Sequence, residues 1–187
     1  MLLTVGRMDA RERYKSHDMA FRALPKLVVA CRDAIYFVLG DSNDVGGLES
    51  AVVGAGVAGR VRFMGEVSLA TLVDAYRMAD PFVMPSTGEG FGIAFLEAMA
   101  CGTPALGFAA AGAKDALADG ELGAAVEDTE LADTLGDLLQ LPRRDPYELS
   151  GATRARFGRR AFAENVCKAT RRLFQLPMRL SVSTADA

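Results

Sequence analysis

The amino-acid sequence predicts an α/β fold in which a doubly wound parallel sheet carries helices on both faces. Short apolar runs alternate with amphipathic segments along the whole chain, which is the order of repeated strand–helix–strand units. The runs are almost continuously apolar, as is typical of strands that helices bury on both sides. We expect strands, in chain order, at residues 2–5, 34–39, 61–67, 81–85, 104–108 and 123–126.

The helices between these strands are predicted from apolar residues at helical spacing. The first covers residues 19–28, although Pro25 should end or bend it. A Ser68 cap favours a helix start at residue 69. The remaining helices are expected at residues 48–53, 93–101 and 131–139, with a basic amphipathic helix over 154–174.

Length and composition limit the class of protein. The chain has 187 residues and a net charge of −3, which favours one domain and argues against nucleic acid as a partner. We expect that domain over residues 1–175 and a disordered tail over residues 176–187. No apolar run approaches the ~20 residues that span a bilayer, and the first residues do not resemble a secretory signal. We therefore expect a cytoplasmic location. The three cysteines lack metal-site spacing and are expected to be reduced thiols.

The segment from Gly54 to Gly59 matches the GxGxxG pattern of dinucleotide-binding folds. That pattern binds a pyrophosphate only where a strand precedes it and a helix opens inside it. Here the preceding residues fit a helix, and residues 60–65 alternate like a strand. We therefore interpret these glycines as a helix-to-strand turn, which makes an NAD-dependent oxidoreductase a poor alternative.

The chain contains one histidine, His17, and this restricts the chemistry. Any Ser-His or Cys-His nucleophilic system would have to be built on that residue. Its place just before a helical pattern favours a structural role at a helix start.

Ligands of doubly wound sheets bind beyond the carboxyl ends of the strands, so the loops there are the candidate site. These loops contain Gly6-Arg7, Gly40-Asp41, Gly65-Glu66 and residues 86–92. Three glycines, Gly88, Gly90 and Gly92, allow a ligand to approach the backbone closely. A helix that opens at Gly92 also presents its first N–H groups to an anion, for which a phosphate is the natural candidate.

Four charged residues accompany this loop. Glu89 and Glu97 are suited to accept hydrogen bonds from sugar and ribose hydroxyls, since carboxylates do not bind phosphate. Arg7 and Lys15 follow the first strand on the ligand side and are suited to a diphosphate. The alternative is that all four are ordinary surface charges, two of them placed favourably at a helix N-terminus.

Several segments, taken together, resemble the carboxyl-terminal domain of glycosyltransferase family 4, one half of a two-domain GT-B enzyme. The resemblance spans roughly residues 3 to 140, in the family's order and spacing. Its most specific element is Glu89-x7-Glu97 followed by the Ala-Met-Ala-x-Gly-x-Pro stretch that ends at Pro104. The other matching segments are Gly6-Arg7-Met8-Asp9, Tyr14-Lys15-Ser16-His17-Asp18, Phe37-Val38-Leu39-Gly40-Asp41, Arg60-Val61-Arg62-Phe63-Met64-Gly65 and Ala79-Asp80-Pro81-Phe82-Val83-Met84-Pro85-Ser86.

The resemblance implies a Rossmann-like domain that binds a nucleotide-sugar donor. Arg7 and Lys15 would hold the diphosphate and, with Glu89 at the transferred sugar, form the catalytic group. Glu97 would bind the ribose. The other donor-binding residues that it implies are Gly6, Asp41, Phe63, Met64, Gly90, Phe91, Gly92 and Ile93, with Phe63 and Met64 near the base.

The resemblance further implies a retaining transfer of a hexose from a GDP- or UDP-linked donor, with no metal and no cofactor. The two cations would stand where a divalent cation stands in other transferases. Two departures affect the donor loops. Only Gly112 and Asp115 remain of a family pattern of paired glycines and a Pro-Glu around residues 110–115, and Ser16 replaces a common glycine.

A GT-B enzyme also needs an amino-terminal domain with the acceptor site, and we expect this chain to be inactive without it. That domain would act in cis or in trans on a glycan, lipid or small-molecule acceptor, and the full enzyme would associate peripherally with a membrane. The alternative function is a non-catalytic nucleotide-binding or interaction module that keeps the donor fold and binds a partner through an exposed apolar face.

Overall fold

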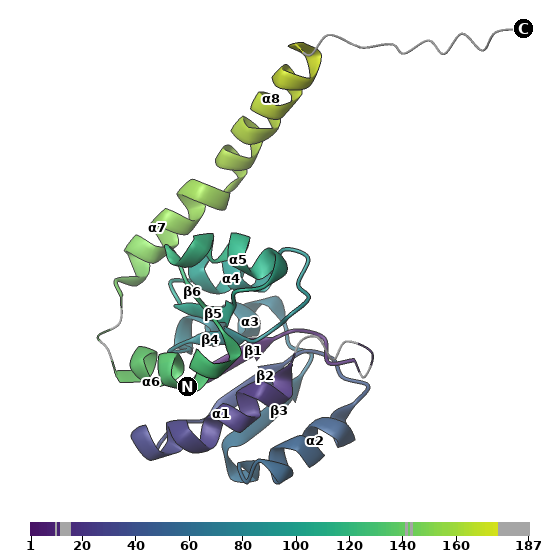
Figure 1. The fold of residues 1–187 in the computed structure, drawn as a ribbon, viewed down its shortest axis with the longest axis vertical. Helices are drawn as coiled ribbons and strands as arrows, with labels where there is room; N and C mark the ends of the chain where they lie inside the picture. Colours follow the sequence, from purple (N-terminus) through teal and green to yellow (C-terminus); the bar gives the residue numbers. More distant parts are fainter. Residues whose placement is uncertain (10, 12–15, 141, 143, 176–187) are drawn as a thin grey trace, which may run out of the picture.

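The protein folds around a six-stranded parallel sheet (Figure 1). The computed structural model describes residues 1–9, 11, 16–140, 142 and 144–175. The strand order is β3-β2-β1-β4-β5-β6, and every neighbouring pair is parallel. The predicted doubly wound α/β fold is confirmed. The strands are β1 (Leu2–Val5), β2 (Tyr36–Leu39), β3 (Val61–Gly65), β4 (Phe82–Met84), β5 (Ala105–Phe108) and β6 (Ala124–Val126).

The strand order reverses between β1 and β4. From β1 the chain builds outward through β2 and β3, and then returns to lay β4, β5 and β6 on the other side. The connections that leave β1 and β4 therefore go to opposite faces of the sheet, which opens a crevice at its carboxyl edge. The loop after Val5 and the loop after Met84 flank this crevice.

Two helical layers cover the sheet, and each buries its own apolar core (Figure 1). Phe21 and Val38 belong to the core of the first layer, and Tyr76 and Phe95 belong to that of the second. The first layer contains α1 (His17–Ala30), α2 (Val45–Gly54) and α6 (Leu131–Gln140). The second layer contains α3 (Leu69–Met78), α4 (Ile93–Ala100), α5 (Ala111–Ala116) and α7 (Pro146–Phe157). Short 3-10 turns occur at Ala58–Arg60, Ala118–Gly120 and Asp128–Glu130.

Several predicted boundaries need correction. Helix α1 does not end at Pro25, because Phe21 and Leu27, buried on either side of the proline, hold both halves against the sheet. The single basic helix expected over 154–174 is two helices that meet at Gly158, α7 and α8 (Arg159–Gln175). Helix α5 was not expected. The predicted cap is confirmed, since the Ser68 hydroxyl accepts a hydrogen bond from the Thr71 N–H at 3.2 Å.

The structure confirms that the Gly54–Gly59 segment is a helix-to-strand turn. Gly54 ends α2, Gly59 lies in a 3-10 turn, and β3 begins at Val61. The context that a dinucleotide-binding glycine loop requires is therefore reversed here.

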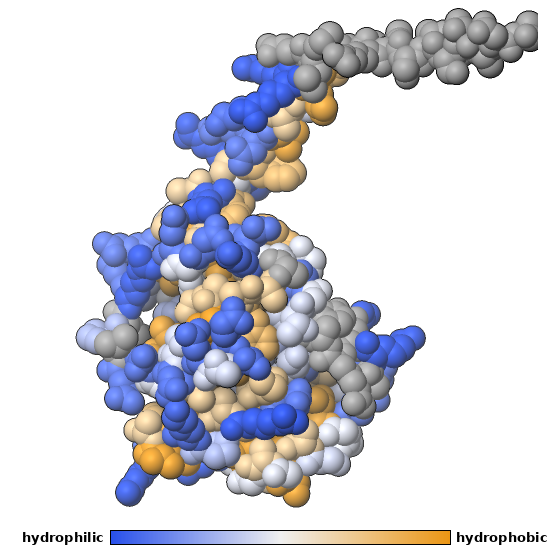
Figure 2. Space-filling model, viewed as in Figure 1, coloured by the Kyte–Doolittle hydropathy of each residue, from blue (hydrophilic) through white to orange (hydrophobic). Residues whose placement is uncertain are grey.

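Helix α8 extends away from the body of the protein (Figure 1). Its side chains are exposed almost throughout, with apolar residues gathered along one side and charged residues along another (Figure 2). Its exposed large apolar residues are Phe162, Val166, Leu173 and Phe174, which recur at helical spacing. Among the residues that the structure describes, no helix is both long and apolar enough to cross a membrane.

Candidate functional site

A cavity of about 350 Å³ opens where the strand order reverses. It lies between the end of β1, the end of β4 and the start of α4, which is where a ligand of a doubly wound sheet binds. Five of the predicted donor-binding residues line it, namely Gly6, Glu89, Phe91, Gly92 and Ile93. Gly90 lies between two of these in the chain. The other lining residues are Val5, Met84 and Ala94.

The amino terminus of α4 forms one wall of this cavity. Gly92 is the N-cap residue, with φ +82°, and as a glycine it has no side chain to cap the first N–H groups of the helix. Gly92, Ile93 and Ala94 all line the cavity. The first backbone N–H groups and the positive end of the helix dipole therefore lie beside the space that an anionic ligand would fill.

Glu89 brings a carboxylate to the same cavity. Its side chain is half-buried, and its Oε1 atom is fully buried without a hydrogen-bond donor among the described residues. A buried acceptor without a donor costs about 1–3 kcal/mol of stability. Because Glu89 lines the cavity, a ligand hydroxyl that reached this carboxylate would supply a donor, which favours a hydroxyl-bearing ligand.

The loop that carries Glu89 is held in place by the start of α5. The Gly112 N–H donates to the Glu89 carbonyl at 3.0 Å. A Cβ atom on Gly112 would lie 2.2 Å from the Gly90 carbonyl oxygen, so only glycine allows the two segments to pack this closely. The packing therefore requires glycine at position 112, in a region where the resemblance to the family is otherwise weak.

We expect Gly112→Ala to push the glycine-rich loop out of place. The added methyl group cannot be accommodated by a rotamer change, because the neighbouring atoms belong to the backbone. The free energy of unfolding should fall by about 1–3 kcal/mol, the usual cost of overpacking, in urea denaturation. Gly46→Ala is the control, since nothing lies within 4 Å of its added Cβ. Equal stabilities for the two variants would contradict the close packing.

Glu97 lies one helical turn beyond Ile93 on the same side of α4. It is exposed, and its Oε2 accepts a hydrogen bond from the Tyr76 hydroxyl at 2.8 Å. Burial first, and the negative charge of Glu97 second, raise the pKa of Tyr76 far above its usual value. Tyr76 is therefore a permanent donor to this carboxylate. Tyr76 was not predicted as a site residue, because its apolar helical spacing indicates only a core position.

The other predicted residues lie around this centre. Arg7 directly follows Gly6 and has an exposed side chain, whereas Lys15 falls outside the described residues. Asp41 follows β2, and its carbonyl accepts a hydrogen bond from the Met8 N–H at 2.8 Å. The roles expected for the side chains of Arg7, Lys15 and Asp41 therefore stay predictions.

The two predicted base-contacting residues, Phe63 and Met64, lie next to each other in β3 but have different surroundings. The Phe63 ring packs edge-on against Phe21 at 6.2 Å and belongs to the core under α1. Met64 is half exposed, at 50%, and lies where the pairing of β2 with β3 is irregular, because Leu39 pairs with Gly65 directly after Val38 pairs with Phe63.

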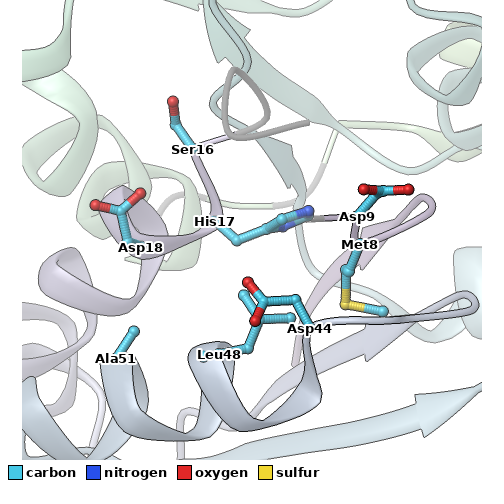
Figure 3. Close-up of a pocket in the computed structure, with 9 residues that line it drawn as sticks. Met8, Asp9, Ser16, His17, Asp18, Asp44, Leu48 and Ala51 are labelled. Atoms are coloured by element: carbon cyan, nitrogen blue, oxygen red, sulfur yellow. The ribbon is translucent and has the colours of Figure 1, made fainter. Parts of the chain in front are cut away.

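A second cavity, of about 400 Å³, lies between the starts of α1 and α2 (Figure 3). His17 begins α1, as predicted, and is buried with its ring directed toward Asp9 and Met8. Asp9 is bound by the Arg11 guanidinium through contacts of 3.0 and 3.1 Å, and these bonds lower its pKa. The cavity is acidic and lies on the face opposite α4. Its lining residues are Met8, Asp9, Ser16, His17, Asp18, Asp44, Gly47, Leu48 and Ala51.

Comparison with known proteins places this geometry in a family. The family model of the group 1 glycosyl transferases matches residues 1–141. The chain is 34% identical over 163 residues to a D-inositol 3-phosphate glycosyltransferase of Geodermatophilus obscurus, covering 82% of this chain and 36% of that protein. It is 34% identical over 140 residues to a GDP-mannose-dependent alpha-(1-6)-phosphatidylinositol monomannoside mannosyltransferase of Mycolicibacterium smegmatis, covering 70% and 37%.

The fold agrees with this relationship. The pneumococcal O-GlcNAc transferase GtfA, whose structure contains UDP and GlcNAc, superposes with a TM-score of 0.71. The superposition covers 93% of this chain and 36% of that one at 17% sequence identity, which shows a shared fold. The chain spans little more than a third of the curated relatives that it matches. It belongs to the group 1 glycosyl transferase family and has the Rossmann-like fold of one half of a GT-B enzyme.

Proposed function

We propose that this chain is the donor-binding half of a retaining, metal-independent glycosyltransferase that transfers a hexose from a GDP- or UDP-linked donor. The observation that carries the proposal is the Glu89 carboxylate, whose Oε1 is buried without a donor among the described residues and whose residue lines the cavity beside the start of α4. A hydroxyl-bearing group and an anionic group placed side by side fit this arrangement. A sugar joined to a diphosphate has both.

Each part of the donor has a counterpart in the chain. The diphosphate lies against the first N–H groups of α4, with Arg7 and Lys15 as its cations. Glu89 accepts hydrogen bonds from the sugar hydroxyls, and Glu97 accepts them from the ribose. Negative charge develops on the departing nucleotide as the glycosidic bond breaks, and the fixed amides and cations stabilise it there. The donor site needs no metal or cofactor in this scheme.

The relatives support the donor class. One relative is named as dependent on GDP-mannose, and the structure of GtfA contains UDP. Because the chain spans little more than a third of its relatives, we assign the acceptor site to a second domain, in cis or in trans. A cytoplasmic location, with peripheral membrane association of the complete enzyme, belongs to the same proposal.

UDP or GDP at millimolar concentration is expected to raise the melting temperature of the chain. A ligand that binds only the folded state adds about 2.7 kcal/mol at 100 times its Kd, which corresponds to a rise of about 5–10 °C for a domain of this size. Differential scanning fluorimetry measures the shift, and NAD is the negative control. If neither nucleotide shifts the melting temperature, the chain is not a donor-binding domain.

The same measurement tests a site residue. Glu97→Ala should reduce the nucleotide-induced shift and lower the melting temperature without ligand by only about 2–4 °C, since the side chain is exposed and the substitution removes the acceptor of one hydrogen bond, that from Tyr76. Glu49→Ala, at an exposed position on α2 in the opposite layer, is the matched control and should keep the full shift.

The second candidate function is a non-catalytic interaction module, which the exposed apolar side of α8 favours. It predicts self-association or partner binding that persists when Glu89 and Glu97 are replaced. The donor-binding function predicts instead that these residues matter for ligand binding. Sedimentation with and without the substitutions distinguishes the two.

A further inference from the structure

We propose that Tyr76 is a positioning residue that makes this site selective for ribonucleotides over 2′-deoxyribonucleotides. The inference rests on the proposed donor-binding function and adds to it a residue from a different helix. The contact that suggests it is the hydrogen bond of 2.8 Å from the Tyr76 hydroxyl to Glu97 Oε2. Tyr76 acts through Glu97 in this proposal and does not touch the donor.

The surroundings of Tyr76 fix the place of its hydroxyl. The side chain is 1% exposed, and its ring packs edge-on against Phe82 with 5.7 Å between the ring centroids. The Tyr76 carbonyl also accepts a hydrogen bond from the buried Thr103 hydroxyl. With both ring and backbone held, the hydroxyl has one position from which to donate.

Glu97 itself has little else to hold it. Its side chain is exposed on α4, and a free glutamate side chain loses rotamer entropy when it is fixed. The hydrogen bond from Tyr76 already restricts the Glu97 side chain before any ligand binds. Because burial raises the pKa of Tyr76 above its usual value, the hydroxyl remains a donor at neutral pH.

The fixed carboxylate is suited to a vicinal diol. Tyr76 engages Oε2 from the side of α3, so Oε1 and the remaining acceptor positions of Oε2 can accept from two neighbouring hydroxyls. The ribose of a nucleotide carries such a pair, whereas the sugar of a 2′-deoxynucleotide has only one hydroxyl there. Accurate placement of Glu97 therefore matters more for the ribonucleotide.

The test is Tyr76→Phe, which keeps the buried ring and removes only the hydroxyl. Kd values are measured by calorimetry on the 187-residue chain for UDP, GDP and their 2′-deoxy forms. A hydrogen bond to a charged group contributes enough for the ribonucleotide Kd to rise about 5- to 10-fold. The deoxynucleotide Kd should change less than about twofold, so the ratio between the two classes falls.

Tyr36→Phe is the matched control. Tyr36 is fully buried, bonds to Thr4 through its hydroxyl, and lies in the core of the opposite layer. It should lower the melting temperature without changing any Kd. In a Glu97→Ala background, Tyr76→Phe should have no further effect on nucleotide binding, because its action passes through that carboxylate.

The outcomes separate the two proposals. If the wild-type chain binds none of the four nucleotides, the donor-binding function is wrong and the role of Tyr76 falls with it. If the wild type binds but Tyr76→Phe weakens both nucleotide classes equally, or neither, the positioning role alone is overturned. A loss that persists in the Glu97→Ala background likewise overturns it and indicates a purely structural tyrosine.

Discussion

Gly40→Ala is expected to lower the free energy of unfolding by about 3–4 kcal/mol, as the sum of backbone strain and overpacking. Gly40 has φ +128°, a conformation that residues with a side chain rarely adopt. A Cβ atom there would lie 2.2 Å from the Gly6 carbonyl oxygen and 2.8 Å from its carbon. Both neighbours are backbone atoms, so no side-chain rotation relieves the contact.

The position of Gly40 explains why the strain cannot relax. Its N–H donates to the Gly65 carbonyl at 2.8 Å, and the Gly6 N–H donates to the Leu39 carbonyl at 3.0 Å. These bonds tie together the carboxyl ends of β1, β2 and β3. Moving Gly40 away from Gly6 would break at least one of them, and Gly6 also lines the proposed donor cavity. The variant should therefore lose nucleotide binding along with stability.

Urea denaturation of the variant and of Gly54→Ala measures this effect. Gly54 lies at the end of α2 with nothing within 4 Å of an added Cβ, so its substitution should be neutral or stabilising by up to about 1 kcal/mol. A Gly40→Ala protein within 1 kcal/mol of wild type would show that the β1–β2 junction is looser than the structure indicates.

The fold was predictable because its signals are local. Each strand is a short apolar run and each helix has its own periodicity, so their alternation alone indicates a parallel sheet. Predictions of individual helices were wrong where contacts between residues far apart in the sequence outweigh the local signal. The helix through Pro25 persists because the core holds residues on both sides of it. Helix α5 is only six residues long, too short for a periodic pattern to reveal.

The candidate site was predictable in part for a similar reason. The three glycines of the loop and the two glutamates lie within ten consecutive residues, 88–97, so sequence spacing alone places them together. Tyr76 lies 21 residues from Glu97 on another helix. Gly112 bonds to Glu89 because the turn after β5 brings the start of α5 against the loop that carries Glu89. Such contacts depend on how helices pack across the sheet, and no local pattern encodes that packing.

Replacing Glu89 with leucine is expected to stabilise the ligand-free protein while removing donor function. The buried Oε1 costs free energy in the absence of a donor, so an apolar side chain there should raise the melting temperature by about 2–4 °C, equivalent to roughly 1 kcal/mol. The control is Glu49→Leu on α2, where the glutamate is exposed and no such gain is expected.

Binding measurements on the same variant locate the contact on the donor. Because we assign Glu89 to the sugar, the Kd for UDP or GDP should stay within about twofold of wild type, whereas the Kd for the matching nucleotide sugar should rise about tenfold. With the acceptor-binding half supplied, the rate of hexose transfer should fall about 100-fold or more. Equal losses for nucleotide and nucleotide sugar would show that Glu89 contacts the nucleotide and not the sugar.

The two effects of this substitution have one physical cause. An acceptor without a donor among the described residues costs free energy that a ligand hydroxyl would remove, so the same atom lowers stability before binding and strengthens binding afterward. A structural glutamate would show the opposite sign, because its loss would lower the melting temperature and leave ligand binding unchanged. The sign of the stability change in Glu89→Leu therefore separates a ligand-binding carboxylate from one that serves the fold.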